Sequence, residues 1–295
     1  MTGKHVIVTG AAPGSLGFET ARILTDWGAT VVITTRSDPR AAAEALRLAG
    51  QNGRTPGHHA LDLSLADSVT RFTEWYAADY GQLDVLVNNA GVHLDLLAQW
   101  KQPRLTPDGV EIHWRTNYLG AAQLTHQLLP LLQRTAQKSG AARVVNVSSM
   151  LHSRGSNAGL FSPPPRYNSW TAYGLSKLAL IHFSFELQRR HGERDGVHAY
   201  CLHPGAVYTH IADKGLAGHP VIQSIRRALA PVESFFLLTP EEGAQTQIHC
   251  ATQAAASGGL YYVKCQPAQA SADAQDARIS AALWENTLAW IDGLG

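Results

Sequence analysis

Cysteine and net charge are both scarce in this 295-residue chain. The three cysteines, at Cys201, Cys250 and Cys265, include no CxxC pair, which argues against a disulfide framework and a structural zinc site. Lysine and arginine exceed aspartate and glutamate by a net charge of +1, and no run of five like charges occurs. We therefore expect a small-molecule partner, rather than a nucleic acid or an anionic membrane.

Long apolar runs are also missing. No stretch of about 18 apolar residues occurs, and the first residues lead directly into a short apolar strand without a hydrophobic signal region of about 7 to 15 residues. We expect no membrane span, and we expect a cytoplasmic protein with reduced thiols. The hydrophobic content of 45% suffices for a large core, and a single domain over residues 1–295 is the predicted organisation.

Short apolar runs alternate with longer amphipathic segments, which is typical of β-α-β units that close a parallel sheet. We expect seven strands, at residues 5–9, 30–34, 57–61, 84–87, 143–147, 197–202 and 259–263. Helices are expected at residues 17–26, 41–49, 65–78, 110–133, 172–190, 241–251 and 279–290. The prediction is a single-domain α/β Rossmann-type fold, a doubly wound parallel sheet of about seven strands flanked by helices.

Two segments depart from this regular pattern. Residues 153–170 contain three consecutive prolines, Pro163 to Pro165, and are expected to form neither a helix nor a central strand. Residues 206–238 follow a predicted strand and mix glycine and proline with apolar residues. Both lie at the carboxyl side of the sheet, where open α/β sheets bind ligands. They are either walls and a lid of a binding site or ordinary surface excursions.

A glycine-rich turn joins the first strand to the first helix. Residues 9–17 read Thr-Gly-Ala-Ala-Pro-Gly-Ser-Leu-Gly. Glycines let a backbone approach a pyrophosphate, and the free N–H groups of a helix start face it, so the turn indicates a dinucleotide site. The alternative is a purely structural turn that uses glycine for its backbone conformation.

The end of the second strand indicates which dinucleotide would bind. Arg36 and Ser37 stand where a carboxylate would accept hydrogen bonds from a ribose 2′-OH. A guanidinium and a hydroxyl suit a 2′-phosphate instead, which favours NADP(H) over NAD(H). Asp38 is the alternative, because it could bind the ribose if the strand ended two residues later.

Tyr173 and Lys177 are spaced i and i+4, on one face of a predicted helix. A nearby ammonium stabilises a phenolate, so we expect a tyrosine pKa lowered toward neutrality and a phenol usable as acid and base. Ser149 ends an apolar strand and could donate to a substrate carbonyl. Taken singly, the spacing could be accidental and the serine could be a turn or cap residue.

With these motifs in this order, the sequence resembles the short-chain dehydrogenase/reductase family, from residue 5 to at least residue 209. The matching positions are Thr9-Gly10 and its turn, Asp62-Leu63, Asn88-Asn89-Ala90-Gly91, Asn117, Ser149, Tyr173 to Lys177, and Pro204-Gly205 through Thr209. Residues 106–111 and 116–120, and the gap of 24 residues between Ser149 and Tyr173, are most similar to retinol-dehydrogenase-like and polyketide ketoreductase-like members.

The resemblance implies a role for each matching residue. Tyr173 would pass a proton to the carbonyl oxygen, Ser149 would hydrogen-bond that oxygen, Lys177 would bind the nicotinamide ribose and bias Tyr173, and Asn117 would hold a relay water. Asp62 would contact adenine, Asn89 the adenosine ribose, and residues 204–209 the nicotinamide end. The expected cofactor-binding residues are Gly10, Gly14, Ser15, Leu16, Gly17, Arg36, Ser37, Asp62, Leu63, Asn89, Ala90, Gly91, Tyr173, Lys177, Pro204, Gly205, Val207 and Thr209.

One feature of the turn departs from the family pattern. The family usually spaces its glycines Gly-x3-Gly-x-Gly, whereas Gly10, Gly14 and Gly17 are separated by three and then two residues. Either Ser15 replaces the middle glycine, or Gly14 keeps that place with a bulge. The fourteen histidines show no metal-ligand spacing, and no metal is expected.

The predicted function is an NADP(H)-dependent oxidoreductase that interconverts a bulky apolar ketone or aldehyde and its alcohol. Residues 1–150 would mainly bind cofactor, and residues 151–295 would carry the catalytic tyrosine helix, the substrate loops and the C-terminal helix. A non-catalytic NADP(H)-binding regulator and an epimerase or isomerase on the same fold are the alternatives. A homo-oligomer is possible.

Overall fold

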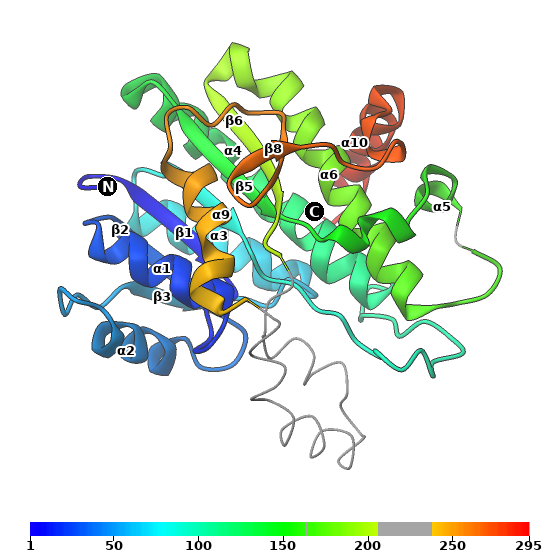
Figure 1. The fold of residues 1–295 in the computed structure, drawn as a ribbon, viewed down its shortest axis with the longest axis horizontal. Helices are drawn as coiled ribbons and strands as arrows, with labels where there is room; N and C mark the ends of the chain where they lie inside the picture. Colours follow the sequence, from blue (N-terminus) through cyan, green and yellow to red (C-terminus); the bar gives the residue numbers. More distant parts are fainter. Residues whose placement is uncertain (163, 206–237, 295) are drawn as a thin grey trace.

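One eight-stranded sheet runs through the molecule in a computed structural model that describes residues 1–162, 164–205 and 238–294. Its strands are β1 (His5–Thr9), β2 (Thr30–Thr35), β3 (Gly57–Ala60), β4 (Val85–Asn88), β5 (Ala142–Val147), β6 (Val197–His203), β7 (Tyr261–Val263) and β8 (Gln266–Ala268). They lie in the order β3-β2-β1-β4-β5-β6-β7-β8 (Figure 1). All neighbouring pairs are parallel except β7 with β8, and the Rossmann-type prediction is confirmed.

The eighth strand was not predicted, so the expectation of seven strands is wrong by one. β7 turns back into β8 through Lys264 and Cys265, whose φ angles are 51° and 62°. Two positive φ angles are typical of the tight hairpin turn that sequence usually marks with Asn-Gly or Asp-Gly. Here neither turn residue is glycine, asparagine or aspartate, and the signal is absent from the sequence.

Helices cover both faces of the sheet (Figure 1). α1 (Leu16–Asp26), α2 (Pro39–Ala49) and α9 (Pro240–Thr252) pack on one face, against a core that includes Val6, Val8 and Val145. α3 (Ala66–Asp79), α4 (Gly120–Ser139) and α6 (Ser169–Asp195) pack on the other, against Ile7 and Val144, and α10 (Ala277–Asp292) lies against α6. Successive residues of a strand face opposite sides, which explains why the central strands are apolar throughout.

Two predicted segments differ in detail from the structure. The helix expected at residues 110–133 is divided into a π-helical turn, η1 (Trp114–Leu119), and α4. Residues 153–170 were expected to exclude a helix, and this is wrong, because η2 (Met150–Arg154), α5 (Asn157–Phe161) and the start of α6 lie there. Ser156 caps α5, Asn168 caps α6, and the prolines fall between the two helices.

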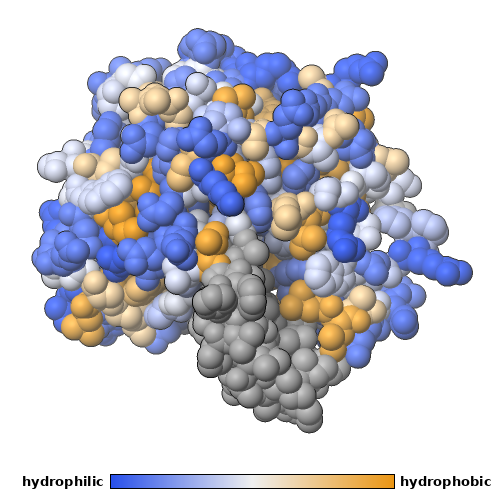
Figure 2. All heavy atoms as spheres, viewed as in Figure 1, coloured by the Kyte–Doolittle hydropathy of each residue, from blue (hydrophilic) through white to orange (hydrophobic). Residues whose placement is uncertain are grey.

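The face of the molecule drawn in Figure 2 is mainly polar. Figure 2 shows hydrophilic residues over most of one face, with smaller hydrophobic areas between them. None of the helices in the described ranges has both the length and the apolar character needed to cross a bilayer. Residues 206–237, which hold most of the second irregular segment, lie outside the described residues.

A buried histidine joins three helices on the α6 side of the sheet. The ring of His182 on α6 lies 2.8 Å (Nδ1) from the Ser280 hydroxyl on α10 and 3.0 Å (Nε2) from Asn157 Oδ1 on α5. Its side chain is 0% exposed. Burial lowers the pKa of His182 to about 4, against the weaker opposing effect of Asp276 and Asp273.

We predict that His182 makes the fold acid-sensitive. Because the folded-state pKa lies below the ordinary histidine value of about 6.5, the unfolded chain gains the proton first as pH falls, and up to about 3 kcal/mol of stability is lost between about pH 6.5 and 4. In urea unfolding, the free energy of unfolding of wild type should fall by up to about 3 kcal/mol more between these pH values than that of His182→Gln. His59→Gln, at a partly exposed site on β3, is the control. Equal declines in all three proteins would contradict the prediction.

Candidate active site

A pocket of about 430 Å³ opens at the carboxyl edge of the sheet, around the point between β1 and β4 where strand order reverses. It is lined by most of the residues that sequence selected. Those are Gly10, Ser15, Leu16, Arg36, Ser37, Asp62, Leu63, Asn89, Ala90, Gly91, Ser149, Tyr173, Lys177, Pro204 and Gly205. Gly14, Gly17 and Asn117 do not line it, and Val207 and Thr209 lie outside the described residues.

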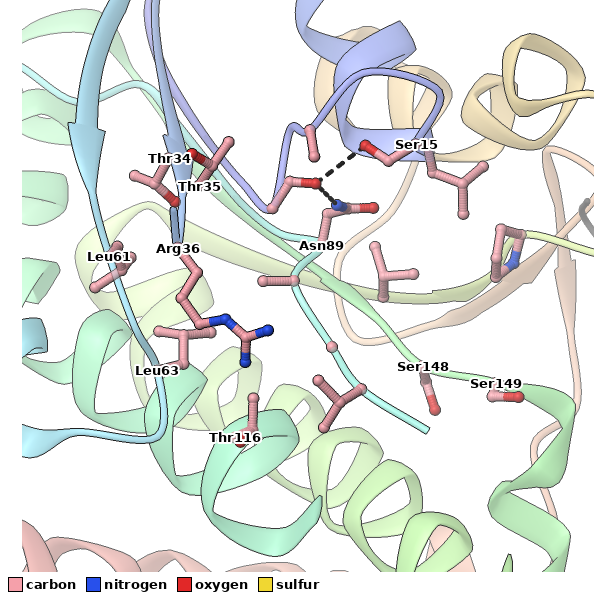
Figure 3. A pocket seen from close by; sticks show the side chains of 18 of the residues that line it. Ser15, Thr34, Thr35, Arg36, Leu61, Leu63, Asn89, Thr116, Ser148 and Ser149 are labelled. Carbon is pink, nitrogen blue, oxygen red and sulfur yellow. Dashed lines mark hydrogen bonds between the residues drawn. The ribbon is translucent and has the colours of Figure 1, made fainter. Parts of the chain in front are cut away.

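The glycine turn shows how the extra residue is accommodated. Gly10 and Gly14 have φ angles of 70° and 75°, a left-handed conformation that favours glycine, whereas Ser15 is extended with φ −100°. The Ser15 hydroxyl accepts from the Phe18 N–H at 3.1 Å and donates to the Gly10 carbonyl at 3.1 Å (Figure 3). Gly14 therefore supplies the left-handed residue, and Ser15 caps α1 instead of replacing a glycine.

Gly17 lies beneath the turn, where there is no room for a side chain. A Cβ atom there would come within 2.4 Å of Asn89 Nδ2 and 2.9 Å of the Gly10 carbonyl oxygen. The Asn89 amide donates to the Thr9 and Gly10 carbonyls at 2.8 and 3.3 Å. Its Oδ1 accepts from Gln247 at 3.2 Å. The Asn89 side chain thus braces the turn.

The second strand ends at Thr35, so the reading in which it extends to Asp38 is wrong. Asp38 instead caps α2, and its Oδ1 accepts from the Ala41 N–H at 2.9 Å. Arg36 is exposed and extends into the pocket (Figure 3). Among the described residues, no carboxylate lies within salt-bridge distance of it.

Two hydroxyls of the pocket were not singled out from the sequence. Thr35 and Thr116 both line it, and their buried Oγ1 atoms have no hydrogen-bond partner among the described residues. Asp62 also lines the pocket, while its Oδ1 accepts from the N–H and hydroxyl of Ser64 at 2.9 and 2.6 Å. Orphaned polar groups that line the same pocket as a glycine turn fit a polar ligand such as a dinucleotide.

Tyr173 and Lys177 lie on α6 as predicted, with the Lys177 Nζ 5.7 Å from the centroid of the tyrosine ring. Both side chains are buried, 7% and 4% exposed. Nζ donates to the Val147 carbonyl at 2.9 Å. Gly91 lets this cation approach the backbone, because a Cβ there would lie 3.2 Å from Nζ.

The expected lowering of the Tyr173 pKa is not found in this structure. Burial raises the pKa of Tyr173 to about 12, with the Ser149 hydroxyl acting in the opposite direction. Burial also lowers the pKa of Lys177 to about 8. Burial disfavours both the Tyr173 phenolate and the Lys177 ammonium. This cost offsets the attraction that the two charged groups would have for each other.

Ser149 follows β5 and begins η2. Its Oγ accepts from the Leu151 N–H at 3.2 Å, so the hydroxyl hydrogen can be donated to a ligand. Asn117, in the π-helical turn η1, is 1% exposed. Its Oδ1 accepts from the Val92 N–H at 2.7 Å, and its amide donates to the Val92 carbonyl and the Ser176 hydroxyl at 2.9 and 3.1 Å. Asn117 therefore joins the β4 loop to α6.

His93 and His203 are neighbours of the site that sequence reasoning missed. The His93 ring stacks on Tyr173, with centroids 4.1 Å apart and planes 11° apart. Burial lowers the pKa of His93 to about 4, which keeps the ring neutral. His203 lines the pocket directly before Pro204. The available signal was sequence position: His93 lies two residues after Gly91, and His203 directly precedes Pro204-Gly205.

The strand order and the pocket at its reversal are the arrangement of dinucleotide-binding α/β folds. The family model of short chain dehydrogenase matches residues 4–218. The human retinol dehydrogenase 11 is 35% identical over 97% of this chain and 85% of its own length. This chain belongs to the short-chain dehydrogenase family, so the resemblance seen in the sequence and the oxidoreductase class are confirmed.

Solved structures agree with this assignment. The crystal structure of an uncharacterised protein from Mycobacterium paratuberculosis is similar with a TM-score of 0.72 and 31% identity, covering 99% of this chain and 94% of that one. The Pseudomonas aeruginosa RhlG/NADP active-site complex is similar with a TM-score of 0.65 and 26% identity, covering 88% and 94%. That relative was crystallised with NADP, which supports a nicotinamide cofactor in the family.

We predict that Gly17→Ala weakens cofactor binding. The added methyl group would force Asn89 and the Gly10 carbonyl apart, an overpacking that costs about 1–3 kcal/mol and about tenfold or more in NADPH affinity. Fluorescence titration with NADPH and thermal unfolding measure both effects. Gly81→Ala is the matched control, because a Cβ at Gly81 meets no atom within 4 Å. Wild-type affinity in Gly17→Ala would show that the turn is not built as described.

Proposed function

We propose that this chain is an NADP(H)-dependent carbonyl reductase or alcohol dehydrogenase, acting on a bulky apolar ketone or aldehyde and its alcohol with Tyr173 as general acid and base. The single observation that carries the proposal is the convergence of Tyr173, Lys177 and Ser149 in the pocket that also holds the glycine turn and Arg36. NADPH, when bound, supplies a hydride, so the carbonyl carbon is reduced as the cofactor is oxidised.

The proton reaches the carbonyl oxygen from Tyr173. A phenol with a pKa raised to about 12 is protonated at neutral pH, so the proton that reduction requires is present on Tyr173. Ser149 stabilises the same oxygen as negative charge develops, through the hydroxyl hydrogen that its bond from Leu151 leaves available. Asn117 Oδ1 accepts one hydrogen bond, from the Val92 N–H, and its second lone pair can accept from the proposed relay water.

Lys177 holds the cofactor ribose and adds positive charge near Tyr173. Its Nζ makes one hydrogen bond within the described structure, to the Val147 carbonyl, and an ammonium has three donors. The remaining donors can serve ribose hydroxyls in the pocket that Lys177 lines. Asp62, which lines the other end of the pocket, is the proposed contact for adenine.

The proposal of a bulky, apolar substrate is supported by an exposed hydrophobic side chain next to Ser149. Met150, which directly follows Ser149, is 59% exposed. A relative with 35% identity is named for retinol, a large apolar alcohol. Both observations support a substrate larger than acetone.

Residues 1–295 are proposed to form a single domain in the cytoplasm. β1 to β5 come from residues 1–150 and β6 to β8 from residues 151–295, yet all eight belong to one sheet. The three cysteines are free thiols, which suits a reducing compartment.

The proposed function is tested with NADPH and three carbonyl compounds, retinaldehyde, decanal and acetone. We expect NADPH oxidation with the two larger compounds, and Tyr173→Phe should lower kcat by about 100-fold or more while the NADPH Kd stays within about twofold. Turnover within threefold of wild type would exclude the tyrosine mechanism. NADPH binding without oxidation by any carbonyl would indicate a regulator, and substrate conversion without net oxidation would indicate an epimerase.

We predict that Arg36 sets the cofactor preference. A charge-assisted contact to the 2′-phosphate is worth about 1.5–3 kcal/mol, or roughly tenfold to a hundredfold in affinity, so wild type should bind NADPH at least tenfold more tightly than NADH. Arg36→Leu should weaken NADPH and leave NADH nearly unchanged, as measured by dissociation constants at fixed ionic strength. Arg40→Leu is the control, because Arg40 is an exposed residue of α2 that does not line the pocket. Equal NADPH binding in wild type and Arg36→Leu would move the preference to Ser15 or Ser37.

A further inference from the structure

The ring of His152 contacts the backbone carbonyl of Ser149, the proposed catalytic serine. His152, on η2, is 6% exposed, and its Nδ1 lies 2.7 Å from the Ser149 carbonyl oxygen. Its Nε2 lies 3.0 Å from the backbone nitrogen of Ser271, which follows β8. The ring also contacts Tyr261 on β7 edge-to-face, with centroids 5.3 Å apart.

These two contacts define the tautomer of His152. A backbone N–H can only donate, so Nε2 must be the unprotonated acceptor for Ser271, and Nδ1 must carry the hydrogen given to the Ser149 carbonyl. Burial lowers the pKa of His152, which keeps the ring neutral and preserves this arrangement. The imidazole therefore acts as a rigid bridge between the catalytic serine and the segment after β8.

Ser149 needs such a bridge because its position depends on a short helix. Met150–Arg154 forms only a 3-10 turn, and it packs backbone to backbone on α6: a Cβ at Gly174 would come within 2.7 Å of the Leu151 carbonyl oxygen. Gly174 directly follows Tyr173. A small shift of η2 along α6 would therefore change the distance between the Ser149 and Tyr173 hydroxyls.

We propose that His152 is a positioning residue that holds Ser149 in register with Tyr173 by anchoring the Ser149 peptide to the segment after β8. The same segment is tied to the region before α6 a second time, because Asn157 donates to the Asp273 carbonyl at 3.0 Å and its N–H donates to the Asp273 carboxylate at 3.2 Å. The proposal rests on the proposed role of Ser149 in turnover.

Two substitutions separate the two contacts of the ring. In His152→Asn, the amide nitrogen stands as many bonds from Cβ as Nδ1 does, so the bond to Ser149 can be kept while the bond to Ser271 is lost. In His152→Gln, the amide reaches the place of Nε2, so the Ser271 bond can be kept while the Ser149 bond is lost. We expect kcat within about threefold of wild type for Asn and about tenfold lower for Gln.

The measurements are NADPH oxidation with decanal, the NADPH dissociation constant and the melting temperature. The dissociation constant should stay within about twofold in both variants, because the effect lies on the serine and not on the cofactor. Equal losses of kcat in the Asn and Gln variants would overturn the proposal, since they would show that His152 only supports the fold. A lower kcat in the Gln variant than in the Asn variant, with equal melting temperatures for the two, supports the proposal.

A double substitution shows whether His152 acts through Ser149. In a Ser149→Ala background, His152→Gln should lower kcat no further, because residues that act as a unit are not additive. A further tenfold loss would overturn the positioning role. If Ser149→Ala alone keeps wild-type turnover, the proposed function of Ser149 fails instead, and the two failures are thereby distinguished.

Discussion

The hydroxyl of Thr9 joins the two strands between which the strand order reverses, and the geometry of the site depends on it. It donates to the Val87 carbonyl at 3.3 Å and accepts from the N–H groups of Asn89 and Ala90, each at 3.0 Å. Because the helices that follow β1 and β4 cover opposite faces of the sheet, a crevice must open here. The backbone pairing of β1 with β4 sets the distance between these strands, and the buried Thr9 hydroxyl extends that connection to the Asn89 loop that bounds the crevice.

Burial of Tyr173 and Lys177 determines which protonation state each side chain favours. The i, i+4 spacing alone suggests that a lysine lowers the pKa of its tyrosine, but that inference assumes a cation that stays charged. In the structure Lys177 and Tyr173 are both buried. Burial raises the pKa of Tyr173 and lowers the pKa of Lys177, so the neutral form of each side chain is favoured. At neutral pH the phenol of Tyr173 therefore keeps its proton, and a phenolate would need positive charge beyond that of Lys177.

Sequence predicted the features that recur at fixed spacing and missed those that depend on remote contacts. The alternation of strands and helices, the Tyr173–Lys177 pair and Arg36 were found because each is visible within one local pattern. The β7–β8 hairpin lacks its usual turn residues, and the π-helical turn that contains Asn117 leaves no compositional signal. His152 belongs to no motif, and the matching segment 116–120 does not by itself mark the hydroxyl of Thr116. Their roles depend on what the fold brings within hydrogen-bonding distance.

The substrate side of the site is held by hydrogen bonds between segments far apart in the chain. The Ser169 hydroxyl donates to the Asp95 carbonyl at 2.8 Å, and the Trp170 indole donates to the Leu96 carbonyl at 3.0 Å, so the β4 loop and the start of α6 are joined next to Tyr173. The Tyr167 hydroxyl donates to the Glu111 carboxylate at 3.0 Å. This bond joins the segment between the prolines and α6 to the residues that precede η1. A change in the loop that breaks these bonds would therefore act on the start of the helix that carries Tyr173. Under the proposed function, the residues that bound the substrate and the position of Tyr173 are coupled through these contacts.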